Sequence, residues 1–113
     1  MSVKILLVDD NDVVRGLARE MLEEAGHDVI EADGAVSALR ICRSIGGIDA
    51  VVTDLVMPDG DGLDLAASLA LLCPGIRVLH TSAYADMRWT GNFIAKPYTS
   101  GELVRALDEL VLQ

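Results

Sequence analysis

The sequence predicts one α/β domain built around a doubly wound, five-stranded parallel sheet. Five apolar runs rich in β-branched residues alternate with stretches of helical periodicity, which is the pattern of a repeated βα unit. The 113 residues suffice for one core, so we expect a single domain over residues 1–113. Apolar residues make up 51% of the chain and aromatic residues only 4%. This favours an aliphatic core between parallel strands and helices on both faces.

The central apolar runs are apolar at consecutive positions, as strands buried on both faces should be. Right-handed crossovers between them predict the flavodoxin-like strand order 2-1-3-4-5. The five strands are expected at residues 3–8, 28–32, 50–53, 76–81 and 92–95.

The first two helices are delimited by glycines. The first is expected to end at Gly26, because glycine readily adopts the left-handed conformation that follows a helix. The second is expected from about Gly34, with Asp33 as a possible N-cap, to the pair Gly46 and Gly47. The apolar stripe of the first helix consists of Val14, Leu17, Ala18, Met21, Leu22 and Ala25.

The third helix is expected over about residues 62–73, with Leu65, Leu69 and Leu72 on its apolar stripe. The last helix has the clearest start, because Thr99 and Glu102 form a T-x-x-E capping box. Tyr98 and Leu103 stand at the two positions of a hydrophobic staple. The last apolar stripe is Leu103, Ala106, Leu107, Leu110 and Val111.

Charge and composition exclude several classes of function. Eighteen acidic and nine basic residues give a formal charge of −9, which disfavours direct binding to nucleic acids and adhesion to anionic membranes. The apolar run after Lys4 stops at two aspartates, which is too short for a signal peptide, and no window is long enough to span a membrane. Cys42 and Cys73 lack metal-ligand spacing and are expected to be free thiols in a reducing cytosol, which predicts a cytoplasmic protein.

Three acidic residues follow two strands that are neighbours in the predicted order. Asp9 and Asp10 come directly after the first strand, and Asp54 directly after the third. In open α/β sheets the functional crevice lies beyond the carboxyl ends of the strands. Three carboxylates that meet there repel one another unless a cation joins them, and oxygen ligands from turns suit Mg²⁺. Asp12 and Asp33, by contrast, are interpreted as solvated helix caps.

Four motifs stand in order at strand ends. They are V-D-D at residues 8–10, D-x-x-M-P-x-x-x-G at residues 54–62, a hydroxyl residue closing the fourth strand, and Lys96 followed by Pro97. Together they resemble a response-regulator receiver domain of two-component signalling, and the resemblance covers essentially the whole chain. It implies a phosphorylation-dependent signalling module that accepts a phosphoryl group from a histidine kinase or a histidine phosphotransfer protein.

The resemblance assigns the phosphoacceptor to Asp54. It assigns Mg²⁺ (or Mn²⁺) to Asp9, Asp10, Asp54 and the backbone carbonyl of Val56. The residue types agree, since a carboxylate can take up a phosphoryl group if the incoming charge is neutralised, which Mg²⁺ and Lys96 can do. The alternative for Lys96 is a purely structural salt bridge to Asp54.

The family's hydroxyl switch falls on Thr81 or Ser82, which are adjacent. The family pattern of a small residue after the switch selects Ser82, which Ala83 follows. Phe93 matches the aromatic residue that moves inward when the hydroxyl engages the phosphoryl group, although a lone phenylalanine in a strand is also a core residue. Val56 and Tyr84 match positions that tune the lifetime of the acyl phosphate, and Tyr84 is alternatively a surface aromatic.

Other site interpretations fail on their spacing. A calcium loop starting at Asp59 would need a glutamate at position 70, which is Ala70. A dehalogenase-type phosphohydrolase would need an aspartate two residues after Asp54, where Val56 stands. His27 and His80 are expected to be structural. The chain is therefore expected not to be an enzyme but a phosphoacceptor that assists its own phosphotransfer and dephosphorylation. A non-switching, receiver-like protein-binding module is the alternative function.

The connection between the fourth and fifth strands is short. Ten residues, 83–92, separate Ser82 from Phe93, whereas a helix that returns along a strand of about 17 Å needs about eleven residues before any turns. We therefore expect the receiver's fourth helix to be shortened to a turn or two, or replaced by extended chain around residues 86–90, with Trp89 over the sheet or in a surface contact. Receivers commonly dimerise through this region, so the chain is expected to be a monomer that docks a downstream protein partner.

Overall fold

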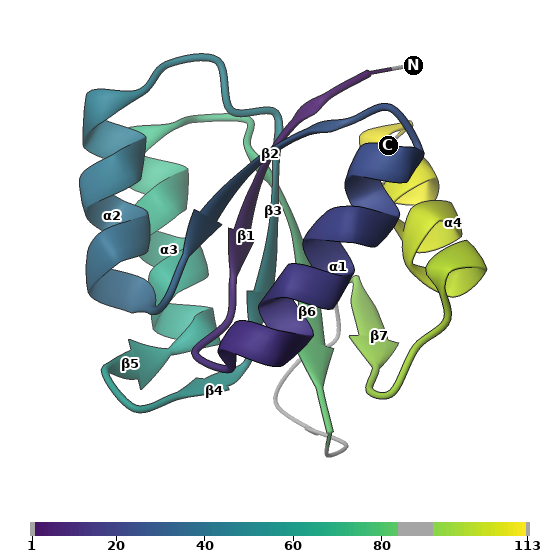
Figure 1. Ribbon diagram of the computed structural model, residues 1–113. Coiled ribbons are helices and arrows are strands. Elements are labelled where there is room, and N and C mark those ends of the chain that lie inside the picture. The colour runs from purple at the N-terminus through teal and green to yellow at the C-terminus, as the bar shows by residue number, and fades with distance from the viewer. Residues whose placement is uncertain (1, 84–91, 113) are drawn as a thin grey trace.

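The computed structural model describes residues 2–83 and 92–112 and contains the predicted sheet. Five parallel strands form the order β2-β1-β3-β6-β7, which is the expected 2-1-3-4-5 order, because β4 and β5 form a separate small hairpin (Figure 1). The strands are β1 (Lys4–Val8), β2 (Asp28–Ala32), β3 (Ala50–Asp54), β4 (Val56–Met57), β5 (Gly60–Asp61), β6 (Arg77–Ser82) and β7 (Phe93–Ala95). The expected boundaries of the five sheet strands are confirmed to within one residue.

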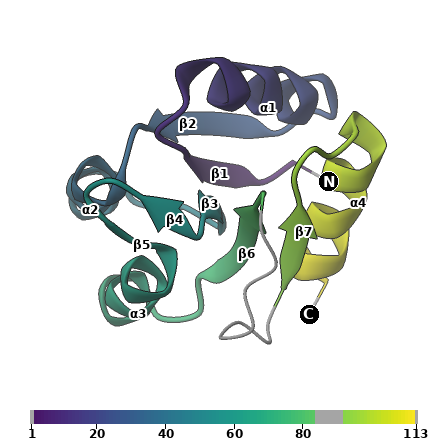
Figure 2. The ribbon, with the colours of Figure 1, turned by 90° about the horizontal axis from the view of Figure 1, so that it is seen from below.

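Helices cover both faces of the sheet, as the composition predicts. Figure 2 shows α1 and α4 on one face and α2 and α3 on the other. The first pair packs on alternate residues of the strands, with Leu7, Val52 and Leu79 in one aliphatic core, and the second pair packs on Leu6 and Val51 in another. The helices are α1 (Asp12–Glu24), α2 (Ala35–Ser44), α3 (Gly62–Leu72) and α4 (Ser100–Val111).

The capping box of α4 is confirmed. The Thr99 hydroxyl accepts a hydrogen bond from the Glu102 amide at 3.1 Å, and the Glu102 carboxylate accepts one from the Thr99 amide at 3.0 Å. Leu103 is fully buried and Tyr98 packs against the same core.

Two predicted helix caps are wrong. Asn11, rather than Asp12, caps α1 by accepting hydrogen bonds from two backbone amides, and Asp12 pairs with Arg15 instead. Asp33 does not cap α2, because its carboxylate accepts a hydrogen bond from the Ser37 hydroxyl at 2.7 Å. Neutral Asn11 is as good an N-cap as aspartate, so residue type alone could not separate these neighbours.

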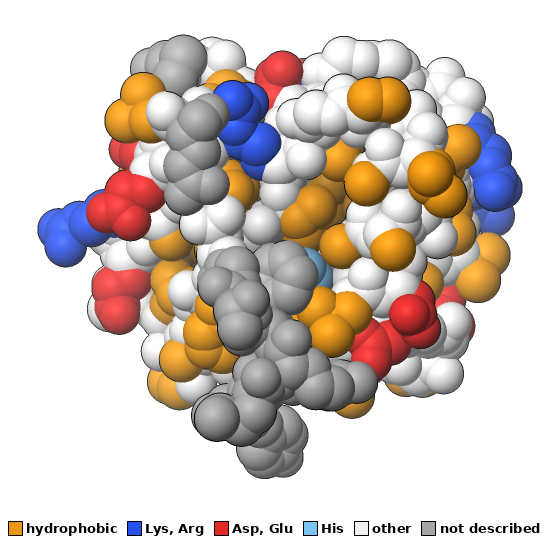
Figure 3. Space-filling view, turned by 180° about the vertical axis from the view of Figure 1, so that it is seen from behind, with side chains coloured by type: hydrophobic (Ala, Val, Ile, Leu, Met, Phe, Trp, Pro, Cys, Tyr) orange, Lys and Arg blue, Asp and Glu red, His pale blue; other side chains and the backbone are white. Residues whose placement is uncertain are grey.

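Some positions of the predicted stripes lie at the surface. Leu17 is 52% exposed and Leu72 is 41% exposed. Leu71, which is not part of the predicted stripe, is 85% exposed. The helical period is only approximate over a long stripe, so its outer members drift away from the core. Apolar side chains are accordingly spread over the surface that α3 presents in Figure 3. No helix in residues 2–83 or 92–112 is long and apolar enough to cross a bilayer.

Both histidines contact the backbone. The Val3 amide donates to the His27 ring at 3.2 Å, and the buried His80 ring lies 3.1 Å from the Gly62 carbonyl at the start of α3. Both cysteines are free, and burial raises the pKa of the Cys42 thiol to about 11. The predicted shortening of the helix between β6 and β7, with Trp89 and residues 86–90, lies outside the described residues.

Candidate phosphoacceptor and metal site

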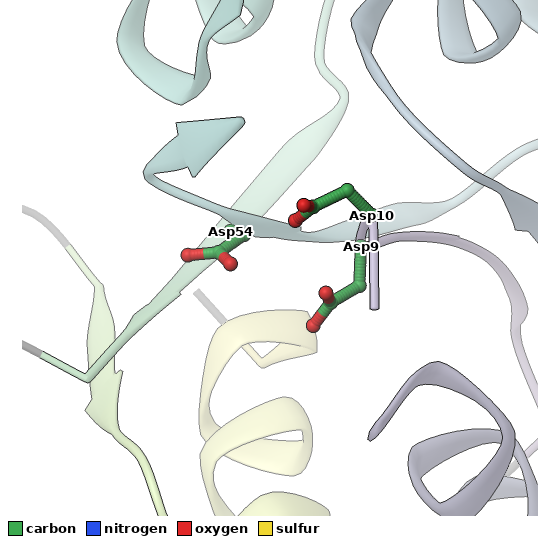
Figure 4. Close-up of side chains that lie close together, drawn as sticks. All are labelled: Asp9, Asp10 and Asp54. Atoms are coloured by element: carbon green, nitrogen blue, oxygen red, sulfur yellow. The ribbon is translucent and has the colours of Figure 1, made fainter. Parts of the chain in front are cut away.

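The topology brings three carboxylates together at the carboxyl end of the sheet. β1 and β3 pair in register, with Val8 beside Thr53, so the acids that follow or end these strands are neighbours. One carboxylate oxygen each from Asp9, Asp10 and Asp54 lies within 4.8 Å of the other two. Figure 4 shows the three side chains around a common space, and we refer to them as the acid cluster.

Lys96 reaches the acid cluster from the end of β7. Its Nζ lies 2.7 Å from Asp9 Oδ2 and 3.1 Å from Asp54 Oδ2, so one ammonium group bridges two carboxylates. Burial opposes the charge on Lys96. The Asp9 hydrogen bond and the charges of Asp54 and Asp9 outweigh burial, so the pKa of Lys96 is raised above its ordinary value. The peptide bond to Pro97 is cis.

The loop that carries Asp9 and Asp10 is fixed by hydrogen bonds. Asp9 is 4% exposed, and its Oδ1 accepts from the Asn11 amide at 2.9 Å. The Arg15 guanidinium donates to the Asp9 carbonyl oxygen at 2.7 Å. The Asp9 side chain is therefore held in place while the Asp10 side chain is exposed at the surface.

Val56 lies at the start of the β4–β5 hairpin, which follows Asp54 after one intervening residue. Its side chain is 62% exposed, and its amide lies 3.5 Å from Asp54 Oδ1. The hairpin returns to β3 because the Gly62 amide donates to the Leu55 carbonyl at 2.8 Å. A Cβ at Gly62 would lie 2.4 Å from the Asp54 carbonyl oxygen, so only glycine permits this close return.

The two hydroxyl residues at the end of β6 are both buried, at 3% exposure each. The register places Thr81 beside Asp54 and Ser82 beside Ala95, the residue before Lys96. The Ser82 carbonyl accepts a hydrogen bond from the Lys96 amide at 2.8 Å. The register therefore puts each hydroxyl residue next to one site residue, and the choice of Ser82 still depends on the family pattern.

Phe93 begins β7 and is 38% exposed, so it is not a core residue in this structure. Its backbone pairs with that of His80. Tyr84, the other aromatic residue proposed for the site, lies outside the described residues.

The geometry and charge of the acid cluster fit a divalent cation. Three carboxylates and one ammonium group, which bridges two of them, leave the site with a formal excess of two negative charges. Such closely spaced acids repel strongly unless a cation joins them. The donor set is made of oxygens from turns and strand ends, which Mg²⁺ and similar hard cations prefer. A carboxylate nucleophile, a cation site and a lysine within hydrogen-bond reach are the groups that phosphoryl transfer to an aspartate requires.

Comparison with known protein families decides the classification. The model of the response regulator receiver domain matches residues 5–108, which include nearly the whole sheet, α1 to α3 and most of α4. The chain belongs to the receiver domain family.

Receivers of different architectures are similar to this one. The sensor kinase CckA of Brucella abortus is 34% identical over 119 residues, covering 97% of this chain and 13% of the kinase. The chemotaxis protein CheY of Halobacterium salinarum is 27% identical, covering 98% of both chains. A receiver protein of Sinorhizobium medicae superimposes with a TM-score of 0.90 at 27% identity, covering 98% of this chain and 95% of that one. This chain spans between 13% and 31% of the length of the first three curated relatives.

Membership gives the chain a general function, which is signalling by phosphorylation. Receiver domains are in general non-enzymatic phosphoacceptors that interact with histidine kinases and phosphotransfer proteins, and they bind Mg²⁺ at an acidic pocket. Within residues 2–83 and 92–112, the acid cluster is compatible with such a pocket. The non-switching alternative is not favoured by these relationships.

Two residues near the site were not singled out by the sequence. Arg15 supports the Asp9 backbone, and Asp59 binds the N-terminus of α2 from a distance of 24 residues along the chain. The D-G-D-G run at residues 59–62 drew attention to Asp59 only as a failed calcium loop. Its long-range partner becomes apparent only when the fold brings the hairpin to α2.

Proposed function

We propose that Asp54 accepts a phosphoryl group from a phosphohistidine of a histidine kinase or a histidine phosphotransfer protein. The observation that carries the proposal is the convergence of three carboxylates with Lys96 bridging two of them. Asp9, Asp10, Asp54 and the Val56 carbonyl are the proposed ligands of Mg²⁺ or Mn²⁺. When bound, the cation would neutralise negative charge on the phosphoryl oxygens.

In the proposed step, an Asp54 carboxylate oxygen attacks phosphorus. The new P–O bond forms as the P–N bond of the phosphohistidine breaks, and the electron pair of that bond stays on the imidazole nitrogen, which remains on the partner. The product is an acyl phosphate. Lys96 already lies 3.1 Å from Asp54 Oδ2, so it can stabilise the charge that builds up on the transferred group.

Ser82 and Phe93 are the proposed switch. The Ser82 hydroxyl would donate to a phosphoryl oxygen, and Phe93 would fill the space that the hydroxyl leaves. Support comes from the buried Ser82 and the partly exposed Phe93 on neighbouring strands. With Lys96→Met or Ser82→Ala, the NMR shifts that phosphorylation induces around Phe93 should be lost. Wild-type shifts in both variants would place the switch elsewhere.

Val56 and Tyr84 are proposed to set the lifetime of the acyl phosphate. Water must reach phosphorus to hydrolyse it, and bulky side chains above the group hinder that approach. The exposed Val56 side chain next to Asp54 supports this role. The chain would thus assist its own phosphorylation and dephosphorylation without acting on an external substrate. Val56→Ala should hasten the loss of phosphate, which intact-mass sampling over time measures.

The proposed setting is cytoplasmic, with a downstream protein partner that docks on the phosphorylated form and without direct contact to nucleic acid. The net charge of −9 supports the exclusion of polyanions. The chain is proposed to remain a monomer in both states. Light scattering tests this, and dimers that appear on phosphorylation would contradict it.

A phosphoryl donor with a P–N bond tests the site of modification. The chain would be incubated with phosphoramidate and Mg²⁺, reduced with sodium borohydride and mapped by peptide mass spectrometry. Borohydride converts an aspartyl phosphate to homoserine, so we expect homoserine at position 54. Conversion at position 9 or 10, or at none of the acids, would overturn the assignment.

A further inference from the structure

Asp59 caps a helix to which it is not adjacent in sequence. Its Oδ1 accepts a hydrogen bond from the Ala35 amide at 2.9 Å, and its Oδ2 accepts one from the Val36 amide at 3.1 Å. Gly34, the N-cap residue of α2, has no side chain that could serve these amides. Hydrogen bonds from the Val36 and Ala35 amides lower the pKa of the Asp59 carboxyl below its ordinary value. These hydrogen bonds fasten the tip of the β4–β5 hairpin to α2. Figures 1 and 2 show from two directions that the hairpin lies beside α2.

The residue at the start of α2 is one that leaves space for the Asp59 carboxylate. A Cβ at Gly34 would lie 2.6 Å from Asp59 Oδ1 and 2.8 Å from Oδ2, so a side chain there would displace the carboxylate. The Gly34 backbone is extended, with φ 177°, so the requirement is space and not conformation. A Cβ at Gly60 would lie 3.0 Å from the Ala35 Cβ, which indicates equally close packing beside Asp59.

The other end of the hairpin is fastened to a second helix. Asp61 caps α3, because its Oδ1 accepts a hydrogen bond from the Leu63 amide at 2.7 Å. The hairpin itself has only two residue pairs, Val56 with Asp61 and Met57 with Gly60. A ladder this short has little stability of its own. The two caps therefore add to the buried Met57 side chain and the Gly62–Leu55 hydrogen bond in holding the segment that carries the Val56 carbonyl.

We propose that Asp59 is a positioning residue for the cation site: by fastening the hairpin to α2, it holds the Val56 carbonyl beside the acid cluster before the cation binds. This inference rests on the proposed function, in which that carbonyl is a ligand. Groups that orient ligands are a large part of metal affinity, because a ligand that is already in place need not be ordered on binding. Without the Asp59 contact, binding has to order the hairpin.

The effect is reciprocal, so cation binding should in turn stabilise the contact between Asp59 and α2. If the Asp59 contact favours cation binding, cation binding must favour the contact by the same factor. The Ala35 and Val36 amides, which donate to Asp59, are therefore expected to exchange with solvent more slowly when the cation is bound. Because this readout reports on α2 and not on phosphorylation, it does not depend on activity.

The test compares Mn²⁺ affinity among variants by following the EPR signal of the free ion. We expect Asp59→Ala to weaken Mn²⁺ binding about tenfold. Asp33→Ala is the matched control, since it removes a neighbouring carboxylate that bonds to Ser37 within α2 and not to the hairpin. Its affinity should remain near that of the wild type. Gly34→Ala keeps the charge of Asp59 but displaces its carboxylate, so it should weaken binding in the same direction as Asp59→Ala.

The outcomes separate this inference from the proposed function. Equal Mn²⁺ affinity in Asp59→Ala and Asp33→Ala would overturn the positioning role. A loss in Asp59→Ala with wild-type binding in Gly34→Ala would show that only the charge of Asp59 matters, which also overturns it. Wild-type binding in Asp10→Ala would instead contradict the cation site itself.

Discussion

The acid cluster and a neighbouring group of charged side chains differ in how their carboxylates are paired with cationic groups. The neighbouring group, which we call the arginine cluster, joins three carboxylates to two guanidinium groups. Arg15 pairs with Asp12 and Glu31, and Arg19 pairs with Glu23 and Glu31, at 2.7 to 3.0 Å. Every carboxylate of the arginine cluster has a cationic partner.

In the acid cluster a single ammonium group serves two carboxylates, and Asp10 has no ion pair among the residues the structure describes. Partly exposed pairs such as those of the arginine cluster contribute little stability each. The excess negative charge of the acid cluster costs stability and creates affinity for a cation. The difference teaches that the group with an unpaired carboxylate is the one suited to binding a cation, while the fully paired arginine cluster supports the Asp9 loop through Arg15.

The largest expected difference between the clusters is in Mg²⁺ affinity. Asp10→Ala removes a ligand and should weaken Mg²⁺ binding by roughly 100-fold. Asp12→Ala removes a carboxylate two residues away that already pairs with Arg15, so its affinity should stay near that of the wild type. Isothermal titration calorimetry measures both. Similar losses in the two variants would mean that general negative charge, and not the acid cluster, attracts the ion.

Mg²⁺ should also stabilise the folded chain. At a concentration 100 times the Kd, we expect about 2.7 kcal/mol of additional unfolding free energy, because the unfolded chain has no such site. Glu31→Gln, in the arginine cluster, should keep this gain, whereas Asp10→Ala should lose it. Urea unfolding with and without Mg²⁺ gives the comparison, and a gain that persists in Asp10→Ala would refute it.

Lys96→Met tests how much Lys96 stabilises the acid cluster when no divalent cation is bound. The buried Asp9 carboxylate would lose its partner at 2.7 Å, so we expect a loss of about 2 kcal/mol in the absence of Mg²⁺. Saturating Mg²⁺ should reduce the loss, since the ion supplies positive charge to the same carboxylates. Chemical unfolding measures both conditions. A loss of the same size in both would mean that Lys96 and the cation act on different groups.

The smallest effect is expected in the arginine cluster, at acid pH. Hydrogen bonds from Arg19 and Arg15 outweigh burial and lower the pKa of the Glu31 carboxyl. A lowered pKa contributes stability above the unfolded value of about 4.3, and this is lost as pH falls through the folded value. Glu31→Gln should therefore cost less than about 1 kcal/mol at neutral pH. Its Tm should also change less than that of the wild type between pH 5 and pH 3, which differential scanning calorimetry can test.

The sequence alone was sufficient to predict the fold and the side chains that meet at the strand ends. Parallel strands place their carboxyl ends on one edge, so Asp9, Asp10, Asp54 and Lys96 could be brought together once the strand order was predicted. The capping box of α4 was equally accessible, because Thr99 and Glu102 interact within one helical turn.

Contacts between residues far apart in the chain could not be predicted in the same way. Asp59 caps α2 across 24 residues, and nothing in the local pattern of either segment indicates the partner. The prediction of Asp12 as the cap of α1 failed for another reason: Asn11 and Asp12 are both good cap types, and the structure has Asn11 as the cap while Asp12 pairs with Arg15.

The central claim is that Asp54 is phosphorylated with the help of a divalent cation. Measuring the intact mass of the chain tests it most directly. Wild type and Asp54→Asn would each be incubated with acetyl phosphate, either with Mg²⁺ or with EDTA. We predict a gain of about 80 Da, one phosphoryl group, only in the wild type with Mg²⁺. The same gain in Asp54→Asn at the wild-type rate, or in the wild type with EDTA, would contradict the account.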